Sequence, residues 1–189
     1  MNLLVLGPQG AGKGTQASRI SDEHGIPHIS TGDMFRAAIE ARTPLGVQVE
    51  PLLRDGILVP DELTVAMIEE RLSQPDARAG FVLDGFPRNL AQADALDEML
   101  GGIGRGLDAI FLFDVSDEVG MERALRRAQL EGRSDDTPQV IARRLETYHS
   151  ETEPIVEHYR ATGKLVTLHA GRSIDEVWAE ISDALQVVA

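Results

Sequence analysis

The stretch GPQGAGKGT, residues 7–15, decides which fold we expect for this chain. It follows the apolar run MNLLVL and places Gly7, Gly12 and Lys13 in register with the phosphate-binding pattern G-x-x-x-x-G-K-[ST]. Closely spaced glycines let backbone N–H groups converge on phosphate oxygens, and a following helix adds its positive N-terminal end. A glycine-rich turn without a ligand is the alternative, but the preceding apolar run and the position of Lys13 favour binding of a nucleoside triphosphate.

Position 14 departs from that pattern. Gly14 stands where Ser or Thr would hold Mg²⁺, and the hydroxyl comes one position later, at Thr15. The loop therefore indicates nucleotide binding more strongly than it indicates what happens to the nucleotide.

The composition narrows the class of protein. A chain of 189 residues with 42% hydrophobic content can form one well-packed domain, and its net charge of −13 argues against general nucleic-acid binding. No apolar run approaches the roughly 18 residues of a membrane helix. The chain has no Cys, and of its five His only His24 and His28 lie four apart, with Gly25 and Pro27 between them. We expect a cytoplasmic protein without a His- or Cys-based metal site.

Five apolar runs are typical of short buried strands, and stretches of helical spacing separate them. The runs span Met1–Leu6, Ile26–Ser30, Gly80–Asp84, Leu107–Ser116 and Lys164–Gly171. Helices are expected from Lys13 to a stop at Gly25, over Asp33–Ala41, in a short stretch ending near 54–56, from an Asp61 cap to Leu72, over Asn89–Leu100, after Ser116, over Thr137–Ser150 and over Ile174–Val187. The alternation predicts an α/β fold with a parallel sheet covered on both faces.

Ligands of such sheets lie beyond the carboxyl ends of the strands. Asp84 ends one strand, where a carboxylate can hold the water shell of Mg²⁺, and Arg88 follows Pro87, which fixes the backbone. Arg123 and Arg127 are four apart and share one helix face. Taken singly, each feature has an ordinary alternative, such as a solvated arginine or a charged helical hairpin.

Together these stretches resemble the adenylate kinases, which convert ATP and AMP into two ADP. The resemblance runs from Leu3 to about Val177 and rests on segments in family order, which are GPQGAGKGT, ISTGDMFR, DGILVPDELT, GFVLDGFPRNLAQADAL, the Arg123/Arg127 pair, GRSDD and RRLETY. The family's phosphate loop has Gly and Thr where Gly14 and Thr15 stand here. Gln9 departs from it, since a proline is usual at that position.

The resemblance implies a role for each matching residue. The residues implied to bind ATP are Gly10, Ala11, Gly12, Lys13, Gly14, Thr15, Arg123, Arg127 and Arg172. The residues implied to bind AMP are Thr31, Arg36, Ile57, Leu58, Val59, Gly85, Phe86, Pro87, Arg88, Gln92, Arg133 and Arg144. Those implied in catalysis are Lys13, Arg88, Arg127, Arg133 and Arg144.

Some of these roles are more specific. Arg123 would stack on the adenine of ATP, the main chain at Arg172 would contact the same base, and Gln92 would recognise the adenine edge of AMP. Arg36 and Arg88 would hold the α-phosphate of AMP, while Asp84 would orient Mg²⁺ through water.

The resemblance also implies how one adenylate kinase domain is divided. Residues 1–29, 60–126 and 138–189 would form the core with its five-stranded parallel sheet, residues 30–59 a helical AMP-binding insertion, and residues 127–137 a short lid. Only the five residues AQLEG separate Arg127 from Arg133, so the lid is the short form and no structural zinc is expected. ATP, AMP and Mg²⁺ are the implied ligands, and a monomer is expected.

Phosphoryl transfer depends on positioning and charge neutralisation, and no catalytic base is required because the AMP phosphate is already a nucleophile. Water is the competing acceptor, so we expect the site to close before transfer. Gly32, Gly56 and Gly132 are the candidate hinges.

Two other functions fit part of the pattern. A uridylate/cytidylate kinase would share the fold and the DGFPRN phrase, although Thr31 and Gln92 favour adenine. A phosphate-loop module that binds ATP without transferring phosphate would fit the loop, but it would leave Arg36, Arg88 and Gln92 without a purpose.

Overall fold

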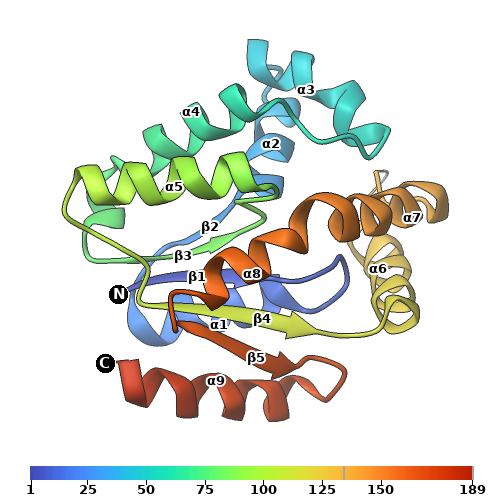
Figure 1. Cartoon of the computed structure of the whole chain (residues 1–189). Helices are drawn as coiled ribbons and strands as arrows, with labels where there is room; N and C mark the ends of the chain where they lie inside the picture. The colour runs from blue at the N-terminus through green and yellow to red at the C-terminus, as the bar shows by residue number, and fades with distance from the viewer. Residues whose placement is uncertain (134, 189) are drawn as a thin grey trace.

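The computed structural model describes residues 1–133 and 135–188, and it contains the predicted parallel sheet (Figure 1). Ser134, which falls in the predicted lid segment, lies outside the described residues, as does Ala189. The strand order is β2-β3-β1-β4-β5. The strands are β1 (Asn2–Leu6), β2 (His28–Ser30), β3 (Phe81–Asp84), β4 (Ala109–Asp114) and β5 (Leu165–His169). The predicted α/β class is confirmed.

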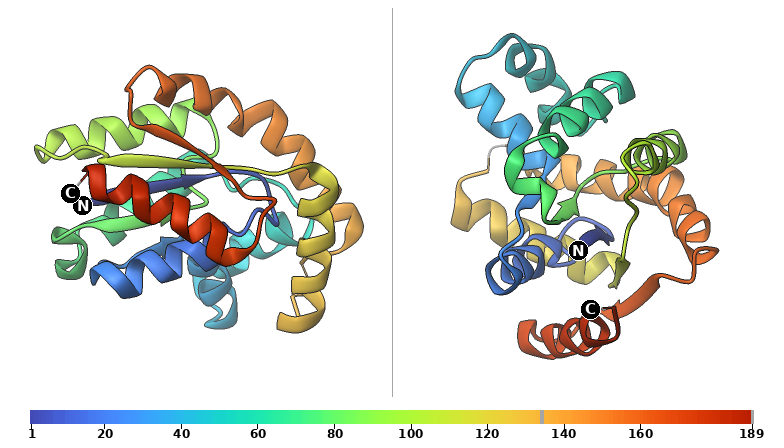
Figure 2. Two further views of the ribbon diagram at one scale, coloured as in Figure 1. Left: turned by 90° about the horizontal axis from the view of Figure 1, so that it is seen from below. Right: turned by 90° about the vertical axis from the view of Figure 1, so that its left-hand side faces the viewer.

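The two faces of the central strand supply two separate cores. Leu4 and Leu6 pack under α4 (Asp61–Leu72), α5 (Leu90–Gly102) and α8 (Pro154–Arg160). Leu3 and Val5 point to the opposite face, under α1 (Lys13–His24) and α9 (Ile174–Val188). Every residue of β1 is buried, as expected for a parallel strand covered on both sides. Figures 1 and 2 show these two helical layers.

Four further helices stand at the rim of the sheet. α2 (Thr31–Glu40) and α3 (Pro44–Arg54) rise from the end of β2, and α6 (Asp117–Glu131) and α7 (Pro138–Thr147) lie beyond the carboxyl end of β4 (Figure 1). Each pair has its own small hydrophobic cluster, around Phe35 and Val49 in the first and around Ala124 and Ile141 in the second. No helix within the described ranges is long and apolar enough to cross a membrane.

The chain between α7 and β5 was predicted incompletely. The predicted helix to Ser150 ends as an α-helix at Thr147, and a π-helical turn (Tyr148–Thr152) leads into α8, which was not predicted. Pro154 begins α8, where its missing N–H costs no helical hydrogen bond, and the turn before it widens so that Glu153 N donates to Tyr148 O at 2.8 Å. A 3₁₀ helix (Pro75–Arg78) also follows α4.

Candidate active site

A cleft of about 890 Å³ opens at the carboxyl ends of the strands and is lined by residues of both the α2/α3 and the α6/α7 pairs. Every predicted site residue except Phe86 lines it. The lining residues from the predicted set are Gly10, Ala11, Gly12, Lys13, Gly14, Thr15, Thr31, Arg36, Ile57, Leu58, Val59, Asp84, Gly85, Pro87, Arg88, Gln92, Arg123, Arg127, Arg133, Arg144 and Arg172. Phe86 is the exception, because its side chain is fully buried in the core beneath the cleft. The fold therefore brings together segments that are far apart in the sequence.

The phosphate loop packs backbone against backbone on α6. Gly10 has a φ of 79°, and a Cβ added there would lie 1.9 Å from the carbonyl oxygen of Gly120. A Cβ on Gly120 would in turn lie 2.8 Å from the carbonyl oxygen of Gln9. Only glycine permits this approach, so the loop is fixed to the helix that carries Arg123 and Arg127.

Lys13 is held by its own loop. Its Nζ donates to the carbonyl oxygens of Gly7 and Pro8, each at 2.7 Å. Burial lowers the pKa of Lys13 to about 8, with Arg88 and Arg127 adding to the effect and Asp84 opposing it. The ammonium thus has a weaker hold on its proton than an exposed lysine, and an incoming phosphate would strengthen it.

Asp84 lies beside Lys13 at the floor of the cleft. Burial alone would raise the pKa of Asp84, but the nearby His28, Lys13 and Arg88 hold it below the ordinary value, so the carboxylate stays charged. Asp84 and Gly14 both line the cleft, so the carboxylate borders the space into which the phosphates would enter. An ionised oxygen ligand at such a place fits a hydrated Mg²⁺. Among the described residues, no group of three or more His, Cys, Asp or Glu is arranged to hold a metal directly.

The predicted AMP side is built around the carbonyl oxygen of Gly85. It accepts hydrogen bonds from Thr31 Oγ1 and from Arg88 Nε, both at 2.8 Å. Burial, followed by the neighbouring Arg144 and Arg36, lowers the pKa of Arg88. Ser30 rather than Thr31 caps α2, accepting from Asp33 N at 3.3 Å. Thr31 is therefore part of the cleft wall.

Asp61 does not cap α4, contrary to the sequence prediction. The N-cap is Pro60, without a side-chain hydrogen bond, and the Asp61 carboxylate accepts from Asn89 Nδ2 at 2.9 Å and from Gln92 Nε2 at 2.7 Å. Gln92 Oε1 in turn accepts from Arg88 N at 2.8 Å. The amide predicted to recognise adenine is thus oriented by a carboxylate that the sequence analysis had assigned only to a helix end.

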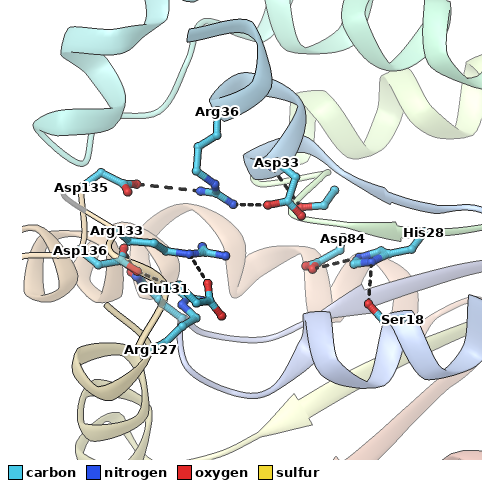
Figure 3. Close-up of polar contacts among 12 residues, drawn as sticks. Ser18, His28, Asp33, Arg36, Asp84, Arg127, Glu131, Arg133, Asp135 and Asp136 are labelled. Carbon is cyan, nitrogen blue, oxygen red and sulfur yellow. Dashed lines mark hydrogen bonds and ion pairs between the residues drawn. The ribbon is translucent and has the colours of Figure 1, made fainter. Parts of the chain in front are cut away.

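Three arginines of α6, α7 and the turn between them, here called the lid arginines, are paired with carboxylates; they are Arg127, Arg133 and Arg144. Arg127 Nη2 lies 2.7 Å from Asp136 Oδ2, and Arg133 Nε lies 2.6 Å from Glu131 Oε2 (Figure 3). Arg144 contacts Asp136 Oδ1 at 2.6 Å. Arg144 also contacts Asp135 Oδ2 at 2.9 Å. On the opposite side of the cleft, Arg36 is bonded to Asp33 of the same helix at 2.6 Å (Figure 3).

Arg123 is bonded to the loop after β5. Its Nη1 donates to Ala170 O at 2.6 Å, and its Nη2 donates to Gly171 O at 3.1 Å and to Arg172 O at 3.3 Å. The side chain of Arg172 points elsewhere, to Glu180 at 3.0 Å. Both residues implied to meet the ATP base are therefore at one place, with Arg123 holding the backbone that carries the other.

The sequence analysis missed several tethers in the cleft. Arg144 Nη2 donates to Leu53 O and Arg143 Nη1 to Asp55 O, each at 3.0 Å, so α7 is bonded to the end of α3. Gln9 Nε2 donates to Asp136 Oδ1 at 2.8 Å. These contacts join distant segments. The only signal for them in the sequence is that Asp135 and Asp136 lie close along the chain to Arg133 and Arg144.

The candidate hinges occupy different settings. Gly56 and Gly132 have φ values of 69° and 64° and lie in turns, Gly132 as the C-cap of α6. Gly32 lies inside the first turn of α2. The predicted lid, 127–137, likewise begins within α6 rather than at its end.

Comparison with known proteins gives a consistent result. The family model described as Adenylate kinase matches residues 5–164. A protein named adenylate kinase from Xanthomonas euvesicatoria pv. vesicatoria is 49% identical over 185 residues, covering 98% of this chain and 99% of the relative. The adenylate kinases of Stenotrophomonas maltophilia and Parvibaculum lavamentivorans are each 46% identical, covering 98% and 99% of this chain and 100% and 93% of their own lengths.

Proposed function

The chain belongs to the adenylate kinase family and catalyses reversible phosphoryl transfer between ATP and AMP, and we propose that lysine and arginine side chains around the transferred phosphoryl group carry out this reaction. The observation that supports this most strongly is the set of positive side chains lining one cleft in a protein of net charge −13. They are Lys13, Arg36, Arg88, Arg123, Arg127, Arg133 and Arg144.

In the proposed reaction an oxygen of the AMP α-phosphate attacks the γ-phosphorus of ATP, and the bond from that phosphorus to the bridging oxygen breaks. One ADP forms from AMP and the other is the leaving group, so no proton has to move. The protein's part is alignment of the two nucleotides and stabilisation of the charge on the transferring oxygens. We assign Lys13 and Arg88 to the centre of this arrangement, because both are half-buried at the floor of the cleft.

We assign adenine recognition in AMP to the wall formed by Thr31 and Gln92. Asp61 orients the amide of Gln92 and the Arg88 backbone N–H fixes its other end. A polar group held in this way can discriminate between bases, because a wrong base leaves it unpaired. The backbone of Ile57, Leu58 and Val59 completes the wall.

We assign closure to the α6/α7 turn and the α2/α3 pair. In this proposal Arg133 exchanges its carboxylate partner for phosphate oxygens when nucleotides are bound, while Arg127 and Arg144 keep Asp136 and offer their remaining N–H groups to the phosphates. Arg133 can exchange its partner because Glu131 belongs to the same segment and is half exposed. Closure also removes water, the competing acceptor.

Asp84 would hold a hydrated Mg²⁺ through water, leaving Thr15 to reach a phosphate. The metal would supply positive charge to the phosphate oxygens. The support is the ionised state of Asp84 and its place in the lining of the cleft. In an Asp84→Asn variant, the Mg²⁺ concentration giving half-maximal rate should rise with the AMP KM unchanged.

Initial rates of ADP formation from MgATP with AMP, CMP or UMP test the assignment of the acceptor. The AMP rate should exceed the other two by at least tenfold, since the Thr31 and Gln92 wall is fitted to adenine. A Gln92→Met variant should narrow that ratio. Equal rates with the three acceptors, or an unchanged ratio in the variant, would contradict it.

We also propose that the enzyme works as a monomer in the cytoplasm. All groups assigned to both nucleotides come from one chain, so the cleft needs no second copy. The cytoplasm is where a balance between ATP, ADP and AMP has to be kept. Light scattering of the active protein tests the first statement, and cell fractionation tests the second.

A further inference from the structure

The side chain of Gln9 bridges the phosphate loop and the turn between α6 and α7. Gln9 Nε2 donates to Asp136 Oδ1 at 2.8 Å, across 127 positions of sequence. The same carboxylate accepts from Arg127 at 2.7 Å and from Arg144 at 2.6 Å. Three segments of the cleft therefore meet at one group, and two of them carry arginines assigned above to the transferring phosphoryl group.

Asp136 can act as a fixed junction because its side chain is fully buried. Burial opposes its charged form, but Arg127, Arg144 and Gln9 outweigh that cost and hold the pKa of Asp136 below the ordinary value. A buried carboxylate is stable only when its oxygens are well supplied with donors. Gln9 is the uncharged donor, and it shares Oδ1 with Arg144. It thereby sets the direction in which the carboxylate faces both guanidinium groups.

The other end of the bridge is equally fixed. The backbone carbonyl of Gln9 lies so close to α6 that a Cβ on Gly120 would approach it to 2.8 Å. The loop therefore cannot shift along α6, and the side chain reaches Asp136 from a rigid base. A displacement of Asp136 would have to break the hydrogen bond rather than carry the loop with it.

Two buried polar atoms in this cluster lack partners among the described residues. They are Gln9 Oε1, an acceptor, and Arg127 Nε, a donor, and Asp136 bonds to both side chains. A buried polar atom without a partner is costly, so both are expected to find one in some working state of the site. Each is the chemical complement of the other.

We propose that Gln9 is a positioning residue for phosphoryl transfer, holding Arg127 and Arg144 in register with the phosphate loop through Asp136. The loop that binds the triphosphate then also sets where the lid arginines stand. This inference rests on the function proposed for Arg127 and Arg144, and it adds a residue that does not itself touch the reacting atoms.

The test compares Gln9→Met, which removes the donor at similar size, with Gln16→Met as a matched control. Gln16 is buried, whereas Gln9 is half-buried, and it donates one hydrogen bond, to Ile174 O at 2.8 Å. Its Oε1 is likewise unpartnered among the described residues. Gln9→Met should lower kcat about tenfold, the scale of a hydrogen bond to a charged group, with the KM for ATP changed less than threefold. Gln16→Met should leave kcat within about twofold of the unmodified enzyme. It should lower the melting temperature about as much as Gln9→Met does.

An Arg127→Met variant completes the design. If Gln9 acts through Asp136 on Arg127, adding Gln9→Met to Arg127→Met should cost much less than another tenfold in kcat. A full further tenfold loss, or a Gln9→Met enzyme that loses only thermal stability, would overturn the positioning role alone. An Arg127→Met enzyme with unchanged kcat would overturn the proposed function of Arg127 and the positioning role with it. Gln9→Asn, which keeps the donor but shortens its reach, should behave as Gln9→Met does.

Discussion

The cations at the floor of the cleft and the lid arginines are held in different ways. Lys13 and Arg88 are bonded to backbone carbonyl oxygens, and in the described part of the chain neither forms an ion pair within 4 Å. Arg127, Arg133 and Arg144 are instead paired with the carboxylates of Asp136, Glu131 and Asp135. The positive charges of Lys13 and Arg88 are therefore available to a bound phosphate. The positive charges of the lid arginines are already balanced by carboxylates.

This difference separates two tasks. A cation held by carbonyls can accept a phosphate without releasing an anion, so the floor is ready to bind as folded. A cation held by a carboxylate must exchange that anionic partner for phosphate or share itself between the two, which couples its arrival at the phosphates to movement of the lid. The floor supplies rigidity and the lid supplies a change that depends on nucleotide. The predictions below test this division, from the largest expected effect to the smallest.

Removing Arg88 should abolish most activity without destabilising the fold. An Arg88→Ala enzyme should lose about 10³-fold or more in kcat, the range for an arginine that stabilises a phosphoryl-transfer transition state. Its unfolding free energy should stay the same or rise, because a half-buried cation without a carboxylate partner is removed. Turnover and urea denaturation check the two parts. A large loss of stability would show that Arg88 is held as the lid arginines are.

Removing Arg127 should lower both kcat and the free energy of unfolding. Arg127→Ala leaves the buried carboxylate of Asp136 short of one donor, so the unfolding free energy should fall by about 1–3 kcal/mol. The kcat should fall about 10²-fold, the scale for losing one preorganised donor. Denaturation and kinetics are measured as for Arg88→Ala. Unchanged stability would break the comparison between floor and lid.

The pH dependence of ATP use should report Lys13. Only the protonated ammonium attracts phosphate, and the pKa of Lys13 is lowered to about 8, so kcat/KM for MgATP should be level below pH 8 and fall about tenfold per pH unit above it. The control is the same profile for AMP at saturating MgATP, where bound triphosphate should keep Lys13 protonated. A kcat/KM for MgATP that stays flat to pH 10 would contradict this account of the floor.

Asp61 should influence only the AMP side. In Asp61→Asn the carboxylate that orients Gln92 and Asn89 becomes a neutral amide, so the KM for AMP should rise about fivefold, as for the loss of one hydrogen bond. The KM for ATP should be unchanged. A rise in both KM values would mean that Asp61 supports the whole cleft and not one wall of it.

The sequence predicted the sheet well because its signals are local. Each buried strand is an apolar run bounded by glycine, proline or a polar residue, and the glycine loop directly follows one of them. Predicted residues such as Lys13 and Arg88 reach the cleft because parallel strands end at one edge. α8 was missed, although Ile155, Val156 and Tyr159 are buried at helical spacing beyond Pro154.

The partners of the cations could not be predicted in the same way. Gln9 and Asp136 meet across 127 positions, and Asp61 meets Gln92 across 31. Neither pairing follows from spacing, because each depends on how the helices pack around the sheet. An acidic residue at the start of a helix is typical of an N-cap, so Asp61 was predicted to have that local role. Its side chain instead makes tertiary contacts with Asn89 and Gln92.

The most direct test is a crystal structure of the enzyme with a bisubstrate analogue that joins ATP to AMP. We predict that Lys13 and Arg88 reach the phosphates with the floor backbone unmoved, and that Arg133 leaves Glu131 to contact a phosphate oxygen. A complex in which Arg133 stays on Glu131, and in which Arg127 and Arg144 do not contact phosphate, would contradict the division between a rigid floor and a lid that responds to nucleotide.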